Sequence, residues 1–169
     1  LYTAQQWRAL SAPLHIVFTT LLYISQHNVD PDELHCIHLG TTAYVLGSVL
    51  WLLVFKILTR APRQNMQRIW DHIMRYYEQH TTSTQYTNLD VKSFCDPKAP
   101  NSDYPRLKGK GAEIKHLVPP LLSAWKRFKR AHNTHDNRLT NLLEQQVIIQ
   151  SLVDESADLM FLPEGDAKK

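Results

Sequence analysis

The sequence is poor in cysteine and glycine, with only two cysteines and five glycines among its 169 residues. Cys36 and Cys95 lie far apart and neither belongs to a CxxC pair, which excludes a disulfide framework and a zinc knuckle and favours a reducing compartment. So few glycines, with nine prolines, exclude a fibrous or low-complexity chain. Because 43% of the residues are hydrophobic and 21% are charged, the chain is neither wholly disordered nor a polytopic membrane protein, and its length suits one ordinary domain.

Motifs of established chemistry are also missing. The sequence contains no GxGxxG, P-loop, GxSxG or HExxH pattern and no set of kinase motifs. We therefore predict that the chain is not an enzyme, and the sequence identifies no cofactor. It begins at Leu1 without an initiator Met, from which we expect a processed or partial chain.

A net charge of only +3 hides an uneven distribution along the chain. Residues 56–130 carry 15 basic and 6 acidic side chains, whereas residues 1–55 and 131–169 are both acidic overall. A basic middle region suits contact with phosphates, anionic lipid or an acidic protein, although a solvated helix face has the same composition. The candidates for a nucleic-acid or anionic surface are Lys108, Lys110, Lys126, Arg127, Lys129 and Arg130.

The most apolar stretch runs from Leu39 to Leu58 and matches the length of about 20 residues that crosses a hydrocarbon core. Its only charge is Lys56, with acidic residues before it and arginines after it, so the positive-inside rule places its C-terminal end on the cytoplasmic or stromal face. Gly40, Gly47 and Ser48 offer small surfaces that let another helix approach closely. A buried central helix of a soluble domain has the same composition, so the sequence leaves both interpretations open.

Amphipathic helices are predicted after this stretch. Residues 62–80 have apolar side chains at three- and four-residue spacing, and Pro62 suits the first turn of a helix. Residues 112–118 can form a helix, which Pro119 and Pro120 are expected to interrupt or kink. The Pro- and Lys-rich segment before it, which ends in LKGKG at residues 107–111, is predicted to be a flexible loop rather than a phosphate site.

The run WKRFKR at residues 125–130 interleaves aromatic and basic side chains. Such a run can stack on bases and neutralise phosphates, or lie along a membrane surface. A plain helix with Trp125 and Phe128 facing the core and the cations facing water is the favoured explanation. A last helix, capped by Thr134 or Asp136, is predicted to place one set of apolar residues on a single face: Leu139, Leu142, Leu143, Val147 and Leu152.

These patterns predict a mainly α fold with one long hydrophobic helix and three to four amphipathic helices. We expect a hydrophobic N-terminal region over residues 1–60, in which Pro13 to Ile24 is too short to span a bilayer and residues 39–58 are long enough. A basic helical region over residues 61–160 and a disordered tail over residues 161–169 follow.

Histidines and acids crowd into residues 27–38. Imidazoles and carboxylates ligate zinc, iron or magnesium, which makes Asp32 and His35 the candidate metal ligands. Their spacing matches no established metal motif and the sequence offers no second ligand cluster, so helix capping by Asp30 or Asp32 is the favoured explanation.

Three segments of the chain carry a family resemblance. They are DELHCIHLGTTAYVLGSVLWLLVFKIL (Asp32 to Leu58), NMQRIWDHIMRYYEQH (Asn65 to His80) and YPRLKGKGAEIKHLVPPLLSAW (Tyr104 to Trp125). Through them, roughly residues 28–160 resemble a repetitive group of uncharacterised, transposon-associated proteins abundant in dinoflagellate algae. The first segment is also similar to part of cut-and-paste transposases with an RNase H-like core, which hold two metal ions for phosphoryl transfer. The resemblance implies a fragment without a working site, in which Asp32 alone matches a metal-binding acid with His35 as its neighbour, and Leu39 to Leu58 is a buried core helix.

Two functional hypotheses follow. The first, which we favour, is a non-enzymatic accessory or structural subunit of a larger assembly. Its partners would be other protein subunits and lipid along Leu39 to Leu58, and the algal resemblance suggests an organellar or photosynthetic membrane complex. The alternative is a fragment of a transposase-derived nucleic-acid-binding protein in the nucleus, whose basic residues 56–130 bind DNA. A weaker third hypothesis is a metal-dependent nuclease centred on Asp32 and His35.

Overall fold

The computed structural model describes residues 34–155, with side chains from Ile37 onward. The chain divides into two units, Leu1–Asp32 and Glu33–Lys169, and the described residues belong to the second. The predictions made for Pro13 to Ile24, for Asp32 and for the tail after residue 160 lie outside the described residues.

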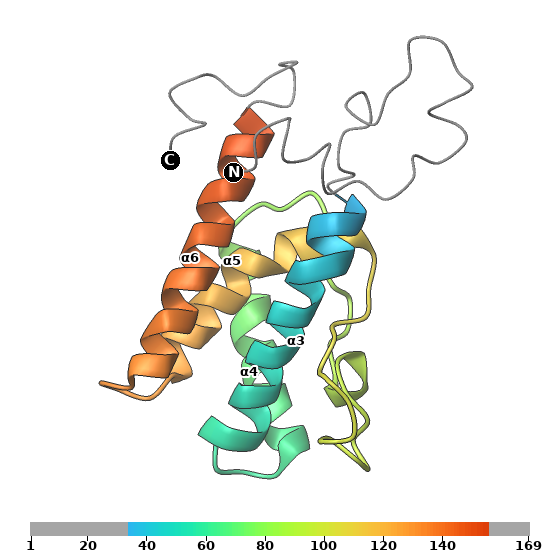
Figure 1. Cartoon of the computed structure of the whole chain (residues 1–169), viewed down its shortest axis with the longest axis vertical. Coiled ribbons are helices and arrows are strands. Elements are labelled where there is room, and N and C mark those ends of the chain that lie inside the picture. The colour runs from blue at the N-terminus through green and yellow to red at the C-terminus, as the bar shows by residue number, and fades with distance from the viewer. Residues whose placement is uncertain (1–33, 156–169) are drawn as a thin grey trace, which may run out of the picture. The chain divides into compact units, whose positions relative to one another are not determined.

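Residues 34–155 are mainly helical and contain no β-strand, which confirms the predicted fold class. The α-helices in this range are α3 (Ala43–Leu52), α4 (Pro62–Gln79), α5 (Gly111–Phe128) and α6 (Thr134–Glu155). The π-helical stretches η2 (Leu34–Thr42) and η3 (Leu53–Ile57) extend α3 at its two ends, and the short 3₁₀ helix η4 (Val91–Ser93) lies between α4 and α5. Helix α5 packs against η2, α3, α4 and α6, whereas α6 lies at one side of the bundle (Figure 1).

The elements η2, α3 and η3 together form one apolar helix from Ile37 to Ile57, close to the predicted residues 39–58. By length and composition it is able to cross a membrane, with a mean hydropathy of 1.6 over its most apolar window, and 50% of that window is buried inside the domain. The backbone leaves helical values at Gly40, where ψ is −109°. The buried side of this helix, which faces α4 and α5, consists mainly of Ala43, Leu46, Val49, Leu50, Leu53 and Val54.

The buried side chain of Asn65 closes the turn between the apolar helix and α4. Its amide nitrogen donates to the carbonyl oxygens of Val54 (2.8 Å), Leu58 (3.1 Å) and Arg60 (2.7 Å), and its Oδ1 accepts from the Arg60 N–H (3.2 Å). Because the last carbonyls of a helix have no donor within that helix, Asn65 satisfies groups that would otherwise be orphaned. Helix α4 follows almost as predicted, and its buried apolar face consists of Met66, Ile69, Ile73 and Tyr77.

Helix α5 continues without a break through Pro119 and Pro120, so the predicted interruption at these residues is wrong. An internal proline removes one helical hydrogen bond and costs about 3 kcal/mol in an isolated helix. By this measure the two prolines together cost about 6 kcal/mol. Here the side chains of Leu117 and Leu121, on either side of the prolines, are completely buried in the core. Burial of a leucine contributes roughly 2 kcal/mol, so the two leucines, together with the buried Ile114, Val118 and Trp125 of the same helix, offset the local preference to end it.

The tight turn between α5 and α6 is built on His132 and Asn133. His132 adopts the left-handed conformation with φ of 58°, which reverses the chain. The Asn133 side chain then accepts the N–H of Asp136 at 3.0 Å and caps α6, so the predicted cap at Thr134 or Asp136 is wrong. Across the turn, the buried Trp125 indole donates to the carbonyl of Asp136 (3.2 Å) and fixes the two helices against each other.

Residues 105–108, which we call the covering segment, lie along the apolar helix. The N–H of Leu107 donates to the carbonyl of Ala43 at 2.9 Å, and the Leu107 side chain is buried. A Cβ atom at Gly47 would lie 2.8 Å from the carbonyl oxygen of Pro105 and 2.9 Å from Arg106 Cα. The small surface at Gly47 therefore admits a non-helical segment rather than the predicted neighbouring helix. This part of the expected flexible loop packs against the apolar helix and buries Leu107.

Candidate functional site

Two lysines of the basic run at residues 125–130 are held by acceptors on α6. The Nζ atom of Lys126 lies 2.7 Å from Glu144 Oε1, and both side chains are partly exposed. Lys129 Nζ donates to Asn137 Oδ1 at 2.7 Å. Solvent weakens such exposed contacts, but each of them engages a side chain that was a candidate for contact with a phosphate or a membrane.

Arg130 is bound more firmly, through its contacts with Asp136. The Asp136 carboxylate is completely buried and accepts Arg130 Nη2 at 2.7 Å, Nε at 2.9 Å and the backbone N–H at 3.0 Å. These hydrogen bonds hold the pKa of Asp136 below its ordinary value. Arg130 thus ties the end of α5 to the start of α6, and binding a phosphate would leave the Asp136 carboxylate buried and unpaired.

The other predicted basic residues lie at separate places. Arg127 is exposed near the end of α5. Lys110 directly precedes α5, where its N–H donates to Glu113 Oε2 at 2.8 Å, and Lys108 belongs to the covering segment. At 1.5 Å per helical residue, Lys110 and Arg127 are about 25 Å apart, so the structure does not gather the six predicted cations into one patch.

The candidate metal ligands cannot be joined into a site within the described residues. Asp32 lies outside them, and His35 is described only as part of the η2 backbone. Among the residues that the structure describes, no three histidine, cysteine or acidic side chains are close enough to share a metal ion.

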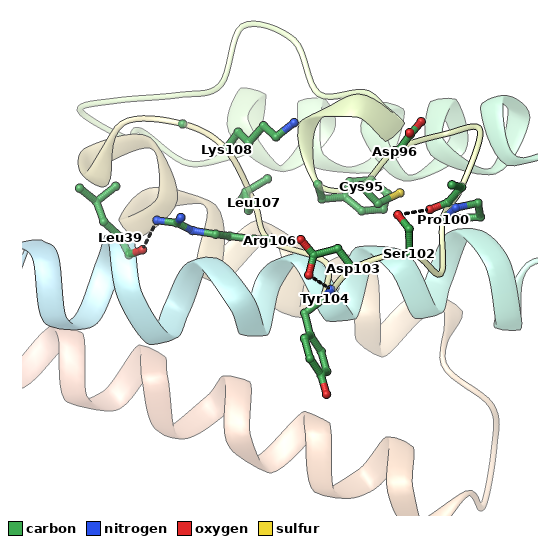
Figure 2. A pocket seen from close by; sticks show the side chains of 13 residues that line it. Leu39, Cys95, Asp96, Pro100, Ser102, Asp103, Tyr104, Arg106, Leu107 and Lys108 are labelled. Carbon is green, nitrogen blue, oxygen red and sulfur yellow. Dashed lines mark hydrogen bonds between the residues drawn. The ribbon is translucent and has the colours of Figure 1, made fainter.

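A cavity of about 530 Å³ lies between residues 94–104 and the covering segment (Figure 2). Arg106 forms one wall, where its Nη2 donates to the Leu39 carbonyl at 3.0 Å and its guanidinium lies 5.4 Å from the centre of the Tyr44 ring. Tyr104 extends away from the other drawn side chains and is 84% exposed (Figure 2). The polar side chains that line this cavity are Cys95, Asp96, Ser102, Asp103, Tyr104, Arg106 and Lys108.

Cys95 is the nucleophile that this cavity offers. Burial and the nearby Asp96 carboxylate raise its pKa, and the positive charge of Lys108 offsets this only in part. Its Sγ atom lies 3.7 Å from the Val91 carbonyl, and no imidazole lines the cavity to accept its proton. A thiol in this environment stays protonated at neutral pH, so the cavity is poorly suited to cysteine catalysis.

Helix α6 presents a second surface in addition to its buried face. The sequence analysis had assigned residues of both surfaces to a single face. Leu143 is completely buried against α5, whereas Leu142 is 43% and Ile149 52% exposed, so the prediction that Leu142 and Leu143 share one face is wrong. Adjacent residues are about 100° apart around a helix, which separates the two leucines. Spacings of three, four, three and four residues, typical of a coiled-coil seam, define what we call the α6 seam: Leu139, Leu142, Gln146, Ile149 and Val153. Leu139, at one end of this seam, also packs against the core.

Gln146 sits in the middle of the α6 seam. Its Oε1 atom is buried and accepts no hydrogen bond. A buried polar atom without a partner costs about 1–3 kcal/mol, and proteins rarely leave one in place. A polar residue at one core position of a coiled coil commonly sets the register and the number of strands. The α6 seam therefore has both the apolar spacing and the polar centre of a helix-pairing surface.

Comparison with known proteins identifies no relative: no family model matches the chain, and no curated protein or solved structure is significantly similar to it. The resemblance to transposon-associated proteins thus stays a prediction.

Proposed function

We propose that this chain is a non-enzymatic subunit of a larger assembly and that it joins that assembly through the α6 seam. The partner we propose is α6 of a second copy of the chain, paired in antiparallel orientation. The observation that carries this proposal is the pair of exposed residues Leu142 and Ile149 on either side of Gln146, whose buried Oε1 atom accepts no hydrogen bond. Among the described helices, α6 lies at one side of the bundle (Figure 1).

A second copy suits this surface because the α6 seam is self-complementary. An amide carries both a donor and an acceptor, so a rotated Gln146 side chain and its symmetry mate can satisfy each other across a two-fold axis. A two-fold axis that crosses α6 at Gln146 pairs the two helices in antiparallel orientation and places Leu142 of one copy beside Ile149 of the other.

In this proposal the apolar helix from Ile37 to Ile57 acts as the core of the subunit rather than as a membrane span. The covering segment, which lies along this helix, carries two charged side chains, Arg106 and Lys108. Trp51 Nε1 also donates to the carbonyl of Pro100 in this connection, at 2.9 Å. Placing this irregular, charged chain in hydrocarbon would leave backbone groups without water, which bilayers do not tolerate.

The proposal is tested by sedimentation equilibrium of the full chain over a range of about 5–500 μM. A seam of two heptads is short, so we expect dimers with a Kd on the order of 10–100 μM, or about −5 to −7 kcal/mol. Ile149→Asp should abolish dimers, since it places a charge in the centre of the paired seam. A chain that stays monomeric up to the highest concentration would refute pairing with a second copy.

Ile148→Asp provides the matched control. Ile148 is 47% exposed, similar to Ile149, but it lies about 100° away around the helix and outside the α6 seam. The two substitutions are chemically identical and differ only in the direction of the side chain. Dimers that survive Ile148→Asp and disappear in Ile149→Asp support the seam, and equal effects of the two substitutions contradict it.

Nucleic-acid binding through the run at residues 125–130 receives less support. Lys126, Lys129 and Arg130 are engaged by acceptors on α6, so a phosphate would have to displace intramolecular partners. We therefore place the transposase-derived DNA-binding hypothesis second. Cations without such partners lie on another face, between α4 and α5.

A further inference from the structure

A small cavity lies between α4 and α5, on a face that neither the α6 seam nor the cavity beside Cys95 uses. Its volume is about 130 Å³, equal to that of roughly four water molecules and close to that of one tetrahedral oxyanion with a bound water. Five side chains from the two helices line it: His72, Arg75, Tyr76, Gln79 and Ser123.

The centre of this cavity is a hydrogen bond between His72 and Ser123. The His72 Nε2 atom lies 3.0 Å from Ser123 Oγ. When the neutral imidazole carries its proton on Nε2, it donates to Oγ, and the serine O–H is then free to donate to a third group. The phenyl ring of Phe128 meets the imidazole edge-on at 5.7 Å between centres and limits its rotation. In this tautomer the pair presents the Ser123 hydroxyl as a hydrogen-bond donor to the cavity.

Positive charge surrounds this donor. The Nε of Arg75 donates to the backbone carbonyl of Asp71 at 3.1 Å. Its terminal nitrogens do not take part in this hydrogen bond. Arg127 follows Ser123 by one helical turn, and Arg68 lies 5.0 Å from the Phe128 ring centre. Within residues 34–155, no carboxylate forms an ion pair with any of these three guanidinium groups.

This arrangement of charges changes the pKa of His72 itself. Burial, then the charge of Arg75 and then that of Arg127 lower the pKa of His72, so the imidazole is neutral at pH 7. The two charges that lower this pKa, those of Arg75 and Arg127, are both cationic. An anion in the cavity would relieve their mutual repulsion.

We propose that this cavity is a binding site for a phosphoryl oxyanion, held by Arg75, Arg127 and the hydroxyl of Ser123. Guanidinium groups match the geometry of phosphate oxygens, and charge-assisted hydrogen bonds are the strongest that such a site can form. The oxyanion is either free phosphate or a phosphomonoester, or one phosphate of a nucleic-acid backbone; the chemistry of recognition is the same. This site is independent of the proposed pairing through α6.

The first experiment titrates the full chain with inorganic phosphate at constant ionic strength and follows the imidazole resonances of His72 by NMR. We expect saturable shifts with a Kd on the order of 1–10 mM and a rise in the pKa of His72 when phosphate is bound. Arg75→Gln should weaken binding at least about tenfold, since it removes a cation and leaves the fold intact. Arg63→Gln removes an exposed arginine from α4 outside the cavity and should leave binding unchanged.

A second arm uses a duplex DNA of about 20 base pairs. DNA binding that phosphate competes for and that Arg75→Gln abolishes assigns the site to a nucleic-acid backbone, whereas phosphate binding without such competition assigns it to a free phosphate or phosphomonoester. Either result supports the site. Shifts that stay linear up to 50 mM phosphate, or equal losses in Arg75→Gln and Arg63→Gln, overturn it.

Discussion

Replacement of Gly47 by alanine is the sharpest test of how the apolar helix is used. The residue lies in the middle of α3 and its surface is covered by the covering segment. The new Cβ would lie 2.8 Å from the Pro105 carbonyl oxygen and 2.9 Å from both the N and Cα atoms of Arg106. These are backbone atoms, so the contact cannot be relieved by rotating a side chain, and the covering segment must move away from the helix.

The magnitude follows from two opposing effects. Alanine is the better helix former and stabilises a helix interior by about 1 kcal/mol relative to glycine. Overpacking against backbone costs about 1–3 kcal/mol, and displacement of the segment weakens its hydrogen bonds, each of which contributes about 1 kcal/mol. The bonds at risk include Leu107 N–H to the Ala43 carbonyl at 2.9 Å and Lys108 N–H to the Ser93 carbonyl at 2.7 Å. We expect Gly47→Ala to lower the free energy of unfolding by about 1–2 kcal/mol.

Urea denaturation followed by tryptophan fluorescence measures this change, and Ser48→Ala provides the control. Ser48 is the next residue of the same helix and is only partly buried, so its replacement should be neutral or stabilising by about 0.5 kcal/mol. If Gly47→Ala instead stabilises the protein by about 1 kcal/mol, Gly47 lies open to lipid or solvent. That result would refute the packing of residues 105–108 against Gly47. It would favour the interpretation of the apolar helix as a membrane span.

Three further predictions concern other contacts. Asn65→Ala should lower the free energy of unfolding by about 2–3 kcal/mol, because buried helix-end carbonyls lose their donor, whereas Gln64→Ala on the exposed side of α4 should change the urea midpoint little. Trp125→Phe should cost about 1–2 kcal/mol in the same assay, since it removes the indole N–H that joins α5 to α6; an unchanged midpoint would contradict this link. The pKa of Asp136 is lower in the folded than in the unfolded chain, so its stabilising effect is complete above about pH 4 and is lost as the pH falls through the folded value. Asp136→Asn should therefore flatten the decline of stability between about pH 5 and 2, and an unchanged pH profile would show that Asp136 does not titrate as described.

Local sequence patterns predicted the helices well where one periodicity dominates. The helix predicted over residues 62–80 is observed as α4, and the apolar stretch is one helix within two residues of its predicted bounds. In α4 and in the apolar helix, most of the residues that are buried in the fold are apolar in the sequence. The prolines at 119 and 120 misled the prediction because the local cost of proline was visible in the sequence, whereas the burial of Leu117 and Leu121 was not.

The candidate sites were harder to predict because their partners come from other elements. Nothing near Arg130 in the sequence distinguishes a free cation from one bound to a buried Asp136. The His72–Ser123 pair joins residues 51 positions apart on two helices, which no local spacing reveals. The α6 seam is different: its three- and four-residue spacing was present in the sequence, and separating Leu142 from Leu143 by helical angle would have identified it.

During synthesis, the apolar helix leaves the ribosome before the residues that cover it. The covering segment follows the end of that helix by about 50 residues, which corresponds to roughly 3–10 s at ordinary translation rates. For that interval the nascent chain displays a stretch with the length and hydropathy of a membrane span, before the covering segment and α5 are available to pack against it. Factors that recognise hydrophobicity alone will compete with folding for this stretch, and the competition ends when residues 105–108 and α5 arrive. We therefore expect slower translation between residues 57 and 128 to prolong the interval in which this stretch is uncovered.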